Sequence, residues 1–262
     1  MMPATKLIEI MLNHRKGLIA LILLLLSGCG SSSLDLKRMQ EAQQQLLGGQ
    51  FSEKTFELII RYTSSDREVT RANACASLAA IALRYGGDVE ARVSSVLTHA
   101  LSDSSQAVRR TAAESFSDLS PGAIKEAEKS LVECLREGND VSWFATEALA
   151  RLGKDGAPVL PALLKALETS PPASVQDEAP QLRIFAAKAL GQVGVSAPEI
   201  VLPVLKKAMT NQNPFFALEA AKAVRTLDLT NAESLAIINE FTNSPRSSLR
   251  EDATHFLRTS KQ

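Results

Sequence analysis

The stretch Leu182-Arg-Ile-Phe-Ala-Ala-Lys-Ala-Leu190 decides the fold, because versions of it recur along the chain. Six copies begin at Thr70, Val108, Val141, Leu182, Phe216 and Leu249, spaced by 38, 33, 41, 34 and 33 residues. The first, fifth and ninth positions of each copy are apolar or small, which places them on one face of a helix. A period of this length predicts an all-α fold, an α-solenoid of about six helix-turn-helix repeats over residues 51–262, in which each repeat packs on its neighbours.

Partner helices fill the intervals between the copies. Val159-Leu-Pro-Ala-Leu-Leu-Lys-Ala-Leu167 and Val201-Leu-Pro-Val-Leu-Lys-Lys-Ala-Met209 match almost position for position, and the proline inside each predicts a bend. The other partner helices are expected at about 52–63, 88–101, 122–137 and 231–242. Ser120-Pro121, Asn213-Pro214 and Ser244-Pro245 each place a capping residue before a proline at the first helical position. Residues 34–50 are expected to form a further helix that caps the first repeat.

These helix pairs resemble HEAT repeats of the short bacterial type. The resemblance rests on the second helix with the pattern of Val108-Arg-Arg-Thr-Ala-Ala and on the first helix Val159–Leu167, and it covers roughly residues 51–258. Arginine follows the first position in four copies, whereas Ser142 and Ala217 replace it in the others, and residues 169–180 insert a Pro-rich loop. Tetratricopeptide repeats have a similar period, but their Trp-Leu-Gly-Tyr pattern is missing. The resemblance implies a binding scaffold.

The N-terminal region resembles a bacterial lipoprotein signal peptide. Lys6, Arg15 and Lys16 precede an apolar run over 18–26, and Leu26-Ser27-Gly28-Cys29 matches the lipobox. The run is shorter than the roughly 20 apolar residues that span a bilayer. The resemblance implies a signal peptide over 1–28, fatty acids such as palmitate on Cys29, and a flexible tether over 29–33.

The location of the protein follows from this resemblance. Gly30 is not aspartate, and by analogy with Gram-negative sorting this favours a lipid anchor in the outer membrane that faces the periplasm. An ordinary secretory signal that contains an incidental cysteine remains the alternative. Translation starts at Met1, Met2 or Met11, and Met11 would leave the more compact leader.

Composition argues against several other classes of protein. Lysine plus arginine and aspartate plus glutamate each number 29, so the chain lacks the basic field that nucleic-acid binding needs. The histidines after Cys29, His99 and His255, lie about four repeats apart, so neither a metal site nor a His-based triad is expected. We predict no catalytic residue, no cofactor, no metal and no enzymatic activity. Cys75 and Cys134 lie within apolar helical patterns and are expected to be buried free thiols.

One face of the second helices is a candidate binding groove. Position three is apolar in three consecutive copies, at Trp143, Ile184 and Leu218. Position seven of the same copies carries charges, at Glu147, Lys188 and Lys222. Trp143 is the expected anchor, because tryptophan is enriched at binding hot spots. In the alternative interpretation, position three only packs between repeats.

The predicted function is that of a membrane-anchored scaffold that binds another protein at the bacterial cell envelope. Two alternatives remain. Some short HEAT proteins resemble bilin lyase subunits, which would make the chain an accessory protein for chromophore attachment. A lipid or small-molecule carrier would need an enclosed apolar cavity.

Overall fold

The computed structural model describes residues 34–49, 51–168 and 179–260, and all regular secondary structure in this part of the chain is helical. The expected signal peptide over 1–28, Cys29 with its tether, and most of the Pro-rich loop over 169–180 lie outside the described residues. Among the described helices, none combines the length and the hydropathy needed to cross a bilayer.

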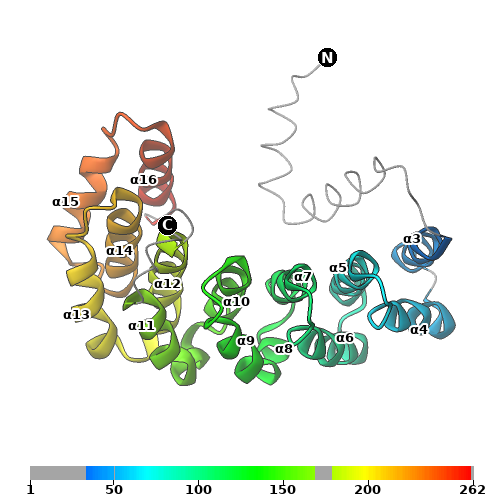
Figure 1. The fold of residues 1–262 in the computed structure, drawn as a ribbon. Coiled ribbons are helices and arrows are strands. Elements are labelled where there is room, and N and C mark those ends of the chain that lie inside the picture. The colour runs from blue at the N-terminus through cyan, green and yellow to red at the C-terminus, as the bar shows by residue number, and fades with distance from the viewer. Residues whose placement is uncertain (1–33, 50, 169–178, 261–262) are drawn as a thin grey trace, which may run out of the picture.

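The helices form two layers that run along the whole array (Figure 1). The inner layer consists of α3 (Leu34–Leu47), α5 (Glu68–Tyr85), α7 (Gln106–Phe116), α10 (Asp140–Ala150), α12 (Ala179–Val193), α14 (Pro214–Leu227) and α16 (Ser247–Thr259). The outer layer consists of α4 (Glu53–Tyr62), α6 (Gly87–Ala100), α8 (Pro121–Glu126), α9 (Glu128–Cys134), α11 (Leu160–Glu168), α13 (Pro198–Ala208) and α15 (Ala232–Phe241). Two short 3-10 helices lie between the layers' elements in sequence. The first, η1 (Gly153–Val159), connects α10 to α11, and the second, η2 (Gly194–Ser196), connects α12 to α13.

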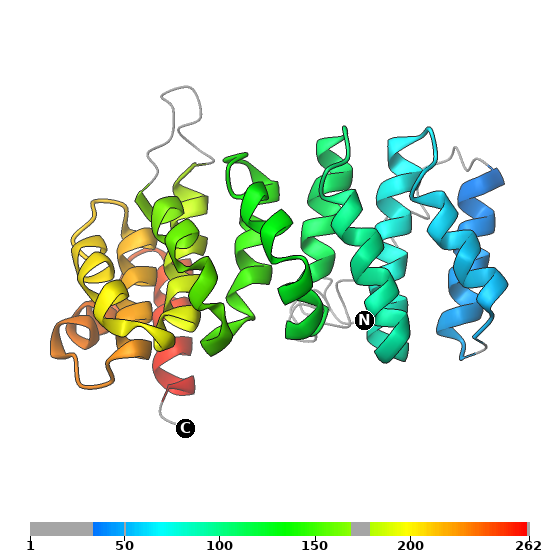
Figure 2. The same ribbon diagram turned by 90° about the horizontal axis from the view of Figure 1, so that it is seen from below.

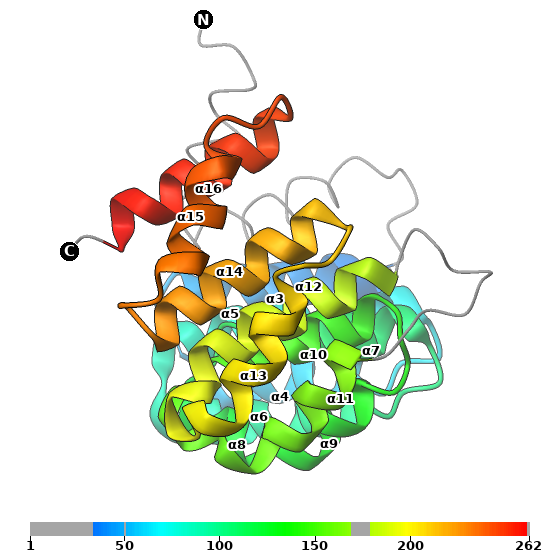
Figure 3. The same cartoon turned by 90° about the vertical axis from the view of Figure 1, so that its left-hand side faces the viewer.

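The array is an α-solenoid, as predicted from the repeat. Its repeats stand side by side when viewed from below (Figure 2), and the view from the C-terminal end shows α12 and α14 above α11 and α13 (Figure 3). The array bends so that the inner helices lie on the inside of the curve (Figure 1). Helix α3 belongs to the inner layer, packs against α4 and α5, and leaves Lys37, Arg38 and Glu41 exposed.

The repeating apolar stripe forms the core between the layers. Positions one, five and nine are buried in the first five copies, from Thr70, Ala74 and Leu78 in α5 to Phe216, Ala220 and Val224 in α14. In the last copy Leu249 and Ala253 are buried, while Leu257 is only partly covered because no further repeat packs on α16 in the described chain. Burial of these side chains is the main favourable term in folding, and neighbouring repeats supply it to each other.

Side-chain caps mark the starts of α4, α8, α10, α14 and α15, and one predicted cap needs correction. Ser120 Oγ accepts a hydrogen bond from Ala123 N at 3.4 Å, and Asn213 Oδ1 accepts from Phe215 N at 3.0 Å, so both predicted caps are confirmed. The cap predicted at Ser244 is wrong, because α16 begins at Ser247 with Arg246 as its N-cap. Ser244 Oγ instead accepts from Arg246 N at 3.3 Å and so holds the turn before the helix.

Two outer helices differ from their predicted form. The helix expected over 122–137 is divided at Ala127 into α8 and α9. The stretch from Val159 to Leu167 is not bent at its proline, because α11 starts at Leu160 and Pro161 occupies its first turn, where a missing N–H costs no helical hydrogen bond. In α13, by contrast, Pro203 lies inside the helix.

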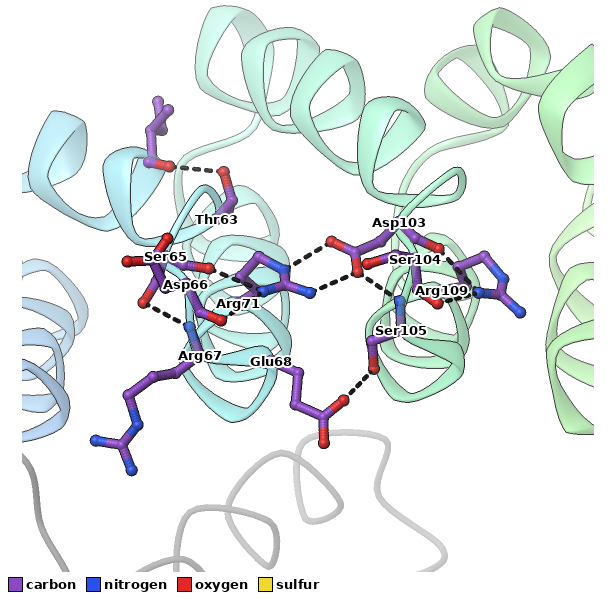
Figure 4. Close-up of polar contacts among 11 residues, drawn as sticks. Thr63, Ser65, Asp66, Arg67, Glu68, Arg71, Asp103, Ser104, Ser105 and Arg109 are labelled. Carbon is purple, nitrogen blue, oxygen red and sulfur yellow. Dashed lines mark hydrogen bonds and ion pairs between the residues drawn. The ribbon is translucent and has the colours of Figure 1, made fainter.

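The arginine at position two links consecutive repeats (Figure 4). Arg71 donates to the Ser65 carbonyl in its own turn at 2.8 Å, and its Nε and Nη2 each donate to the Asp103 carboxylate of the next turn at 2.8 Å. Arg109 makes the same kind of contacts. Its Nη1 donates to the Asp103 carbonyl, and its Nε and Nη2 donate to the two carboxylate oxygens of Glu137, each at 2.8 Å. These bidentate pairs define an arginine ladder across the first three repeats.

The ladder stops at the third repeat, where serine replaces the arginine. Ser142 Oγ donates to the Cys134 carbonyl at 2.8 Å and accepts from Gly138 N at 2.8 Å. Ser142 therefore stabilises the turn before α10, but its side chain is too short to reach the turn before the next inner helix. In the fourth repeat Arg183 donates to the Leu167 carbonyl at 3.0 Å and lies over the Phe216 ring, 4.3 Å from its centroid.

Asp103→Asn is expected to lower the free energy of unfolding at pH 7 by about 1–2 kcal/mol, because a charge-assisted bidentate pair is lost. The Arg71 hydrogen bond holds the pKa of the Asp103 carboxyl below its ordinary value of 3.8, against a smaller opposing effect of burial. A lowered folded-state pKa favours the folded chain above pH 3.8, and this contribution disappears as the pH falls through the folded-state value. Urea unfolding should therefore show a gap between wild type and variant at pH 7 that narrows well below pH 3.8.

Asp155→Asn is the matched control, because this aspartate in the first turn of η1 is exposed and its carboxylate makes no ion pair with another described residue. It should leave the stability unchanged at both pH values. A gap for Asp103→Asn that keeps its size in acid would contradict the assigned pairing.

Candidate binding surface on the inner helices

The chain's single tryptophan, Trp143, lies on the inner helix α10 and is partly buried. Its ring stacks on Phe185 of α12, with centroids 6.3 Å apart and planes inclined by 12°. Trp143 Nε1 is buried and has no hydrogen-bond partner within the described residues. Trp143 and Phe185 therefore form an aromatic pair that joins two repeats, with Ile184 partly exposed beside Phe185 on α12.

Charged side chains flank the aromatic pair. Glu147 Oε1 of α10 and Lys188 Nζ of α12 are 3.8 Å apart, and their side chains are 41% and 48% exposed. Both come from position seven of their copies, so stacking brings this position together in the third and fourth repeats. At such exposure the pair adds little stability, about 0–1 kcal/mol, so its charges remain available to a partner.

Position seven of the preceding copy is Glu114 of α7, a partly buried side chain. Burial is the largest cause that raises the pKa of its carboxyl; Arg110 opposes the shift, and Asp118, Glu147 and Asp140 add to it. Arg110 is itself engaged, because its Nε lies 3.4 Å from Asp140 Oδ2 and its guanidinium lies over the Phe144 ring.

Two residues of the predicted groove do not lie on an open surface. Leu218 is 1% exposed and belongs to the core, so the apolar stripe does not extend along α14. The Lys222 side chain is 14% exposed, and its Nζ bonds Glu219 Oε2 at 2.7 Å and Asp252 Oδ1 at 2.9 Å. Since Asp252 lies on α16, the last repeat closes against α14 where the sequence predicted an open face.

The ammonium of Lys222 stays charged in this setting. Burial alone would lower its pKa, but Glu219 and Asp252 outweigh that effect and raise the pKa. Lys222 therefore connects the last two repeats internally, and it is unavailable to a partner. Of the six predicted residues, the structure brings Trp143, Ile184, Glu147 and Lys188 together and assigns Leu218 and Lys222 to packing.

Sequence reasoning missed two aromatic residues of this surface, Phe144 and Phe185. Both occupy position four of the copy, next to the apolar residue at position three. The signal was available, because position four is aromatic only in these two consecutive copies and is polar in the other four. The aromatic pair could therefore have been predicted, because position three of one copy is Trp143 and position four of the next copy is Phe185.

No metal or thiol chemistry is evident in the part of the chain that the structure describes. It contains no group of three or more His, Cys, Asp or Glu side chains placed to hold a metal ion. Cys75 and Cys134 are buried and unpaired, as expected from the sequence. Burial raises the pKa of the Cys75 thiol to about 12 and that of Cys134 to about 11.

Both thiols are therefore expected to resist modification in the native state, because the thiolate is the reactive form. In a Cys29→Ala variant, which leaves only these two cysteines, an aromatic disulfide reagent near neutral pH should release almost no chromophore from the folded chain. Addition of urea should expose two thiols per chain. A rapid reaction of either thiol without urea would show that its helix opens easily.

Comparisons with known proteins agree with this architecture. A family model described as HEAT repeats matches residues 94–179, so this part of the chain has HEAT repeats. The chain is similar to the complex of CpcE and CpcF of phycocyanin lyase from Nostoc sp. PCC7120, with a TM-score of 0.62, 21% identity, and coverage of 79% of this chain and 77% of that one. It is also similar to the archaeal HEAT-like repeats protein from Thermococcus onnurineus NA1, with a TM-score of 0.50, 16% identity, and coverage of 87% and 97%. No curated protein matches significantly.

Proposed function

We propose that this chain is a lipid-anchored HEAT-repeat scaffold that binds another protein at the bacterial cell envelope, with the inner surface of α10 and α12 as its binding site. The aromatic pair of Trp143 and Phe185 carries the proposal. Aromatic side chains at the centre of a surface with flanking charges are typical of binding hot spots. Solenoids commonly bind along their inner side, where consecutive repeats present aligned positions.

The proposed anchor rests on the lipobox ending at Cys29. Two or more fatty acyl chains would hold the protein firmly, since each buried methylene contributes about 0.8 kcal/mol. Cys29→Ala is expected to move the chain from the membrane fraction to the soluble fraction and to abolish labelling by radioactive palmitate. If the variant stays in the membrane and the wild type takes up no label, the anchor is wrong.

The binding site can be tested by site-specific photocrosslinking in cells. A photoreactive residue at Lys188, on the inner side, should capture one defined envelope protein. The same residue at Lys207, exposed on the outer helix α13, is the matched control and should not capture it. Combining the probe at 188 with Trp143→Ala should remove the crosslink, provided that helicity and melting temperature are unchanged. Equal capture from 188 and 207 would contradict the proposed site.

The likeness to the CpcE and CpcF complex favours a second candidate, an accessory protein similar to a phycocyanin lyase subunit. In that case the purified chain should bind a free bilin and change its visible absorption spectrum. An unchanged spectrum, together with a crosslinked envelope protein, would leave the scaffold as the function.

A further inference from the structure

Position seven of three consecutive inner helices forms a row of charges, with Glu114 on α7, Glu147 on α10 and Lys188 on α12. Lys188 lies near Glu147, with 3.8 Å between the charged atoms. Glu114, at the other end of the row, is partly buried, and its side-chain carboxylate makes no hydrogen bond or ion pair within the described residues. The row therefore holds two carboxylates and one ammonium.

The surroundings of Glu114 supply one cation, Arg110, and this cation is shared with other groups. The neighbouring groups that act on its carboxyl are Arg110, Asp118, Glu147 and Asp140, three of which are acidic. The one basic neighbour, Arg110, interacts with Asp140 at 3.4 Å and with the Phe144 ring at 5.5 Å. A carboxylate that loses water without gaining a cation is costly, and a bound cation would offset that cost.

The aromatic pair lies beside these carboxylates on the same helices. Trp143 is one turn before Glu147 on α10, and Phe185 is almost one turn before Lys188 on α12. The surface thus places an apolar platform next to two carboxylates. A negative field of this kind repels nucleic acids and anionic lipid headgroups, and it attracts basic side chains.

We propose that this surface binds a protein segment in which a lysine or arginine lies next to a bulky apolar side chain. The basic group sits between Glu114 and Glu147, and the apolar side chain lies on Trp143 and Phe185. This assignment rests on the proposed function, because it specifies the partner of the same surface. Charge complementarity gives the partner its orientation along the row, with its basic residue over α7 and α10.

The test uses the full chain in detergent micelles and random 12-residue peptides displayed on phage. Because Trp143 is the single tryptophan, its fluorescence reports directly on occupancy of the surface by synthetic copies of the selected peptides, made without tryptophan. We expect selected peptides to contain lysine or arginine next to an aliphatic or aromatic residue and to change the Trp143 emission.

Three variants examine the charge. Glu114→Gln is nearly isosteric, and we expect it to weaken binding about tenfold or more while leaving the melting temperature unchanged or raised. Glu233→Gln, an exposed glutamate on the outer helix α15, is the matched control and should bind like wild type. Glu114→Lys should prefer peptides whose basic residue is replaced by glutamate, a reversal that a purely structural role would not produce.

The outcomes separate the two levels of the proposal. If peptides change the Trp143 emission but bind Glu114→Gln and wild type equally, the basic partner residue is wrong and the binding surface stands. If no selected peptide changes the Trp143 emission, the surface itself fails, and the proposed function loses its site together with this inference.

Discussion

Phe216→Ala is expected to lower the free energy of unfolding by about 3–5 kcal/mol, the usual cost of removing a buried phenylalanine. Phe216 is 2% exposed, occupies position one of α14, and lies under the guanidinium of Arg183 from the preceding inner helix. The substitution therefore removes core packing and a cation–π contact between the fourth and fifth repeats. Urea unfolding followed by circular dichroism measures the loss.

Because repeats stabilise one another through their interfaces, the loss should also change the shape of the transition. The repeats formed by α13 to α16 are expected to unfold at lower urea than the rest. Phe215→Ala is the matched control in the same helix, since Phe215 is 39% exposed, and it should cost less than about 1 kcal/mol. Equal losses for both variants would contradict the assigned burial.

Gly191→Val is expected to cost about 3 kcal/mol, because α12 and α14 touch at this glycine. A Cβ atom at position 191 would lie 2.9 Å from Ala223 Cα and 3.0 Å from Ala223 Cβ, so the two helices would have to separate. Valine also adds two methyl groups to the same contact. Thermal unfolding should give a clearly lower melting temperature for this variant.

Gly122→Ala is the control for glycine replacement within a helix. A Cβ at position 122 of α8 meets only Ser120 Oγ, at 3.7 Å. Alanine is the better helix former, so this variant should be as stable as wild type or more stable by about 0.5 kcal/mol. If Gly191→Val proves as harmless as Gly122→Ala, the close approach of α12 and α14 is wrong.

Much of the fold could be predicted because the burial pattern repeats. Each second helix shows the same three core positions, and stacking makes them buried in every repeat with two neighbours. The break at Ala127 carries no comparable signal, since neither glycine nor proline marks it. The start of α16 was misplaced because Ser244-Pro245 has the composition of a cap, although the serine holds the preceding turn.

The candidate surface was predictable only in part, because exposure depends on how neighbouring repeats close on one another. Position three is partly exposed at Trp143 and Ile184 but buried at Leu218. At position seven the last repeat makes a similar difference, because Asp252 of α16 binds Lys222 of α14. The exposure of such a position cannot be predicted from one repeat alone, because it depends on contacts between residues about 30 positions apart in sequence.

The end of the arginine ladder at Ser142 has a mechanical consequence. Bidentate hydrogen bonds fix both distance and angle, so the first three repeats should behave as a stiff beam. Apolar packing tolerates small sliding of one helix along another, and between α10 and α12 it acts without such a bond. The array should therefore bend most easily between α10 and α12, the two helices that the aromatic pair connects. A partner bound there would set the curvature of the array, and a pulling force along the array would change the spacing of the proposed binding surface first.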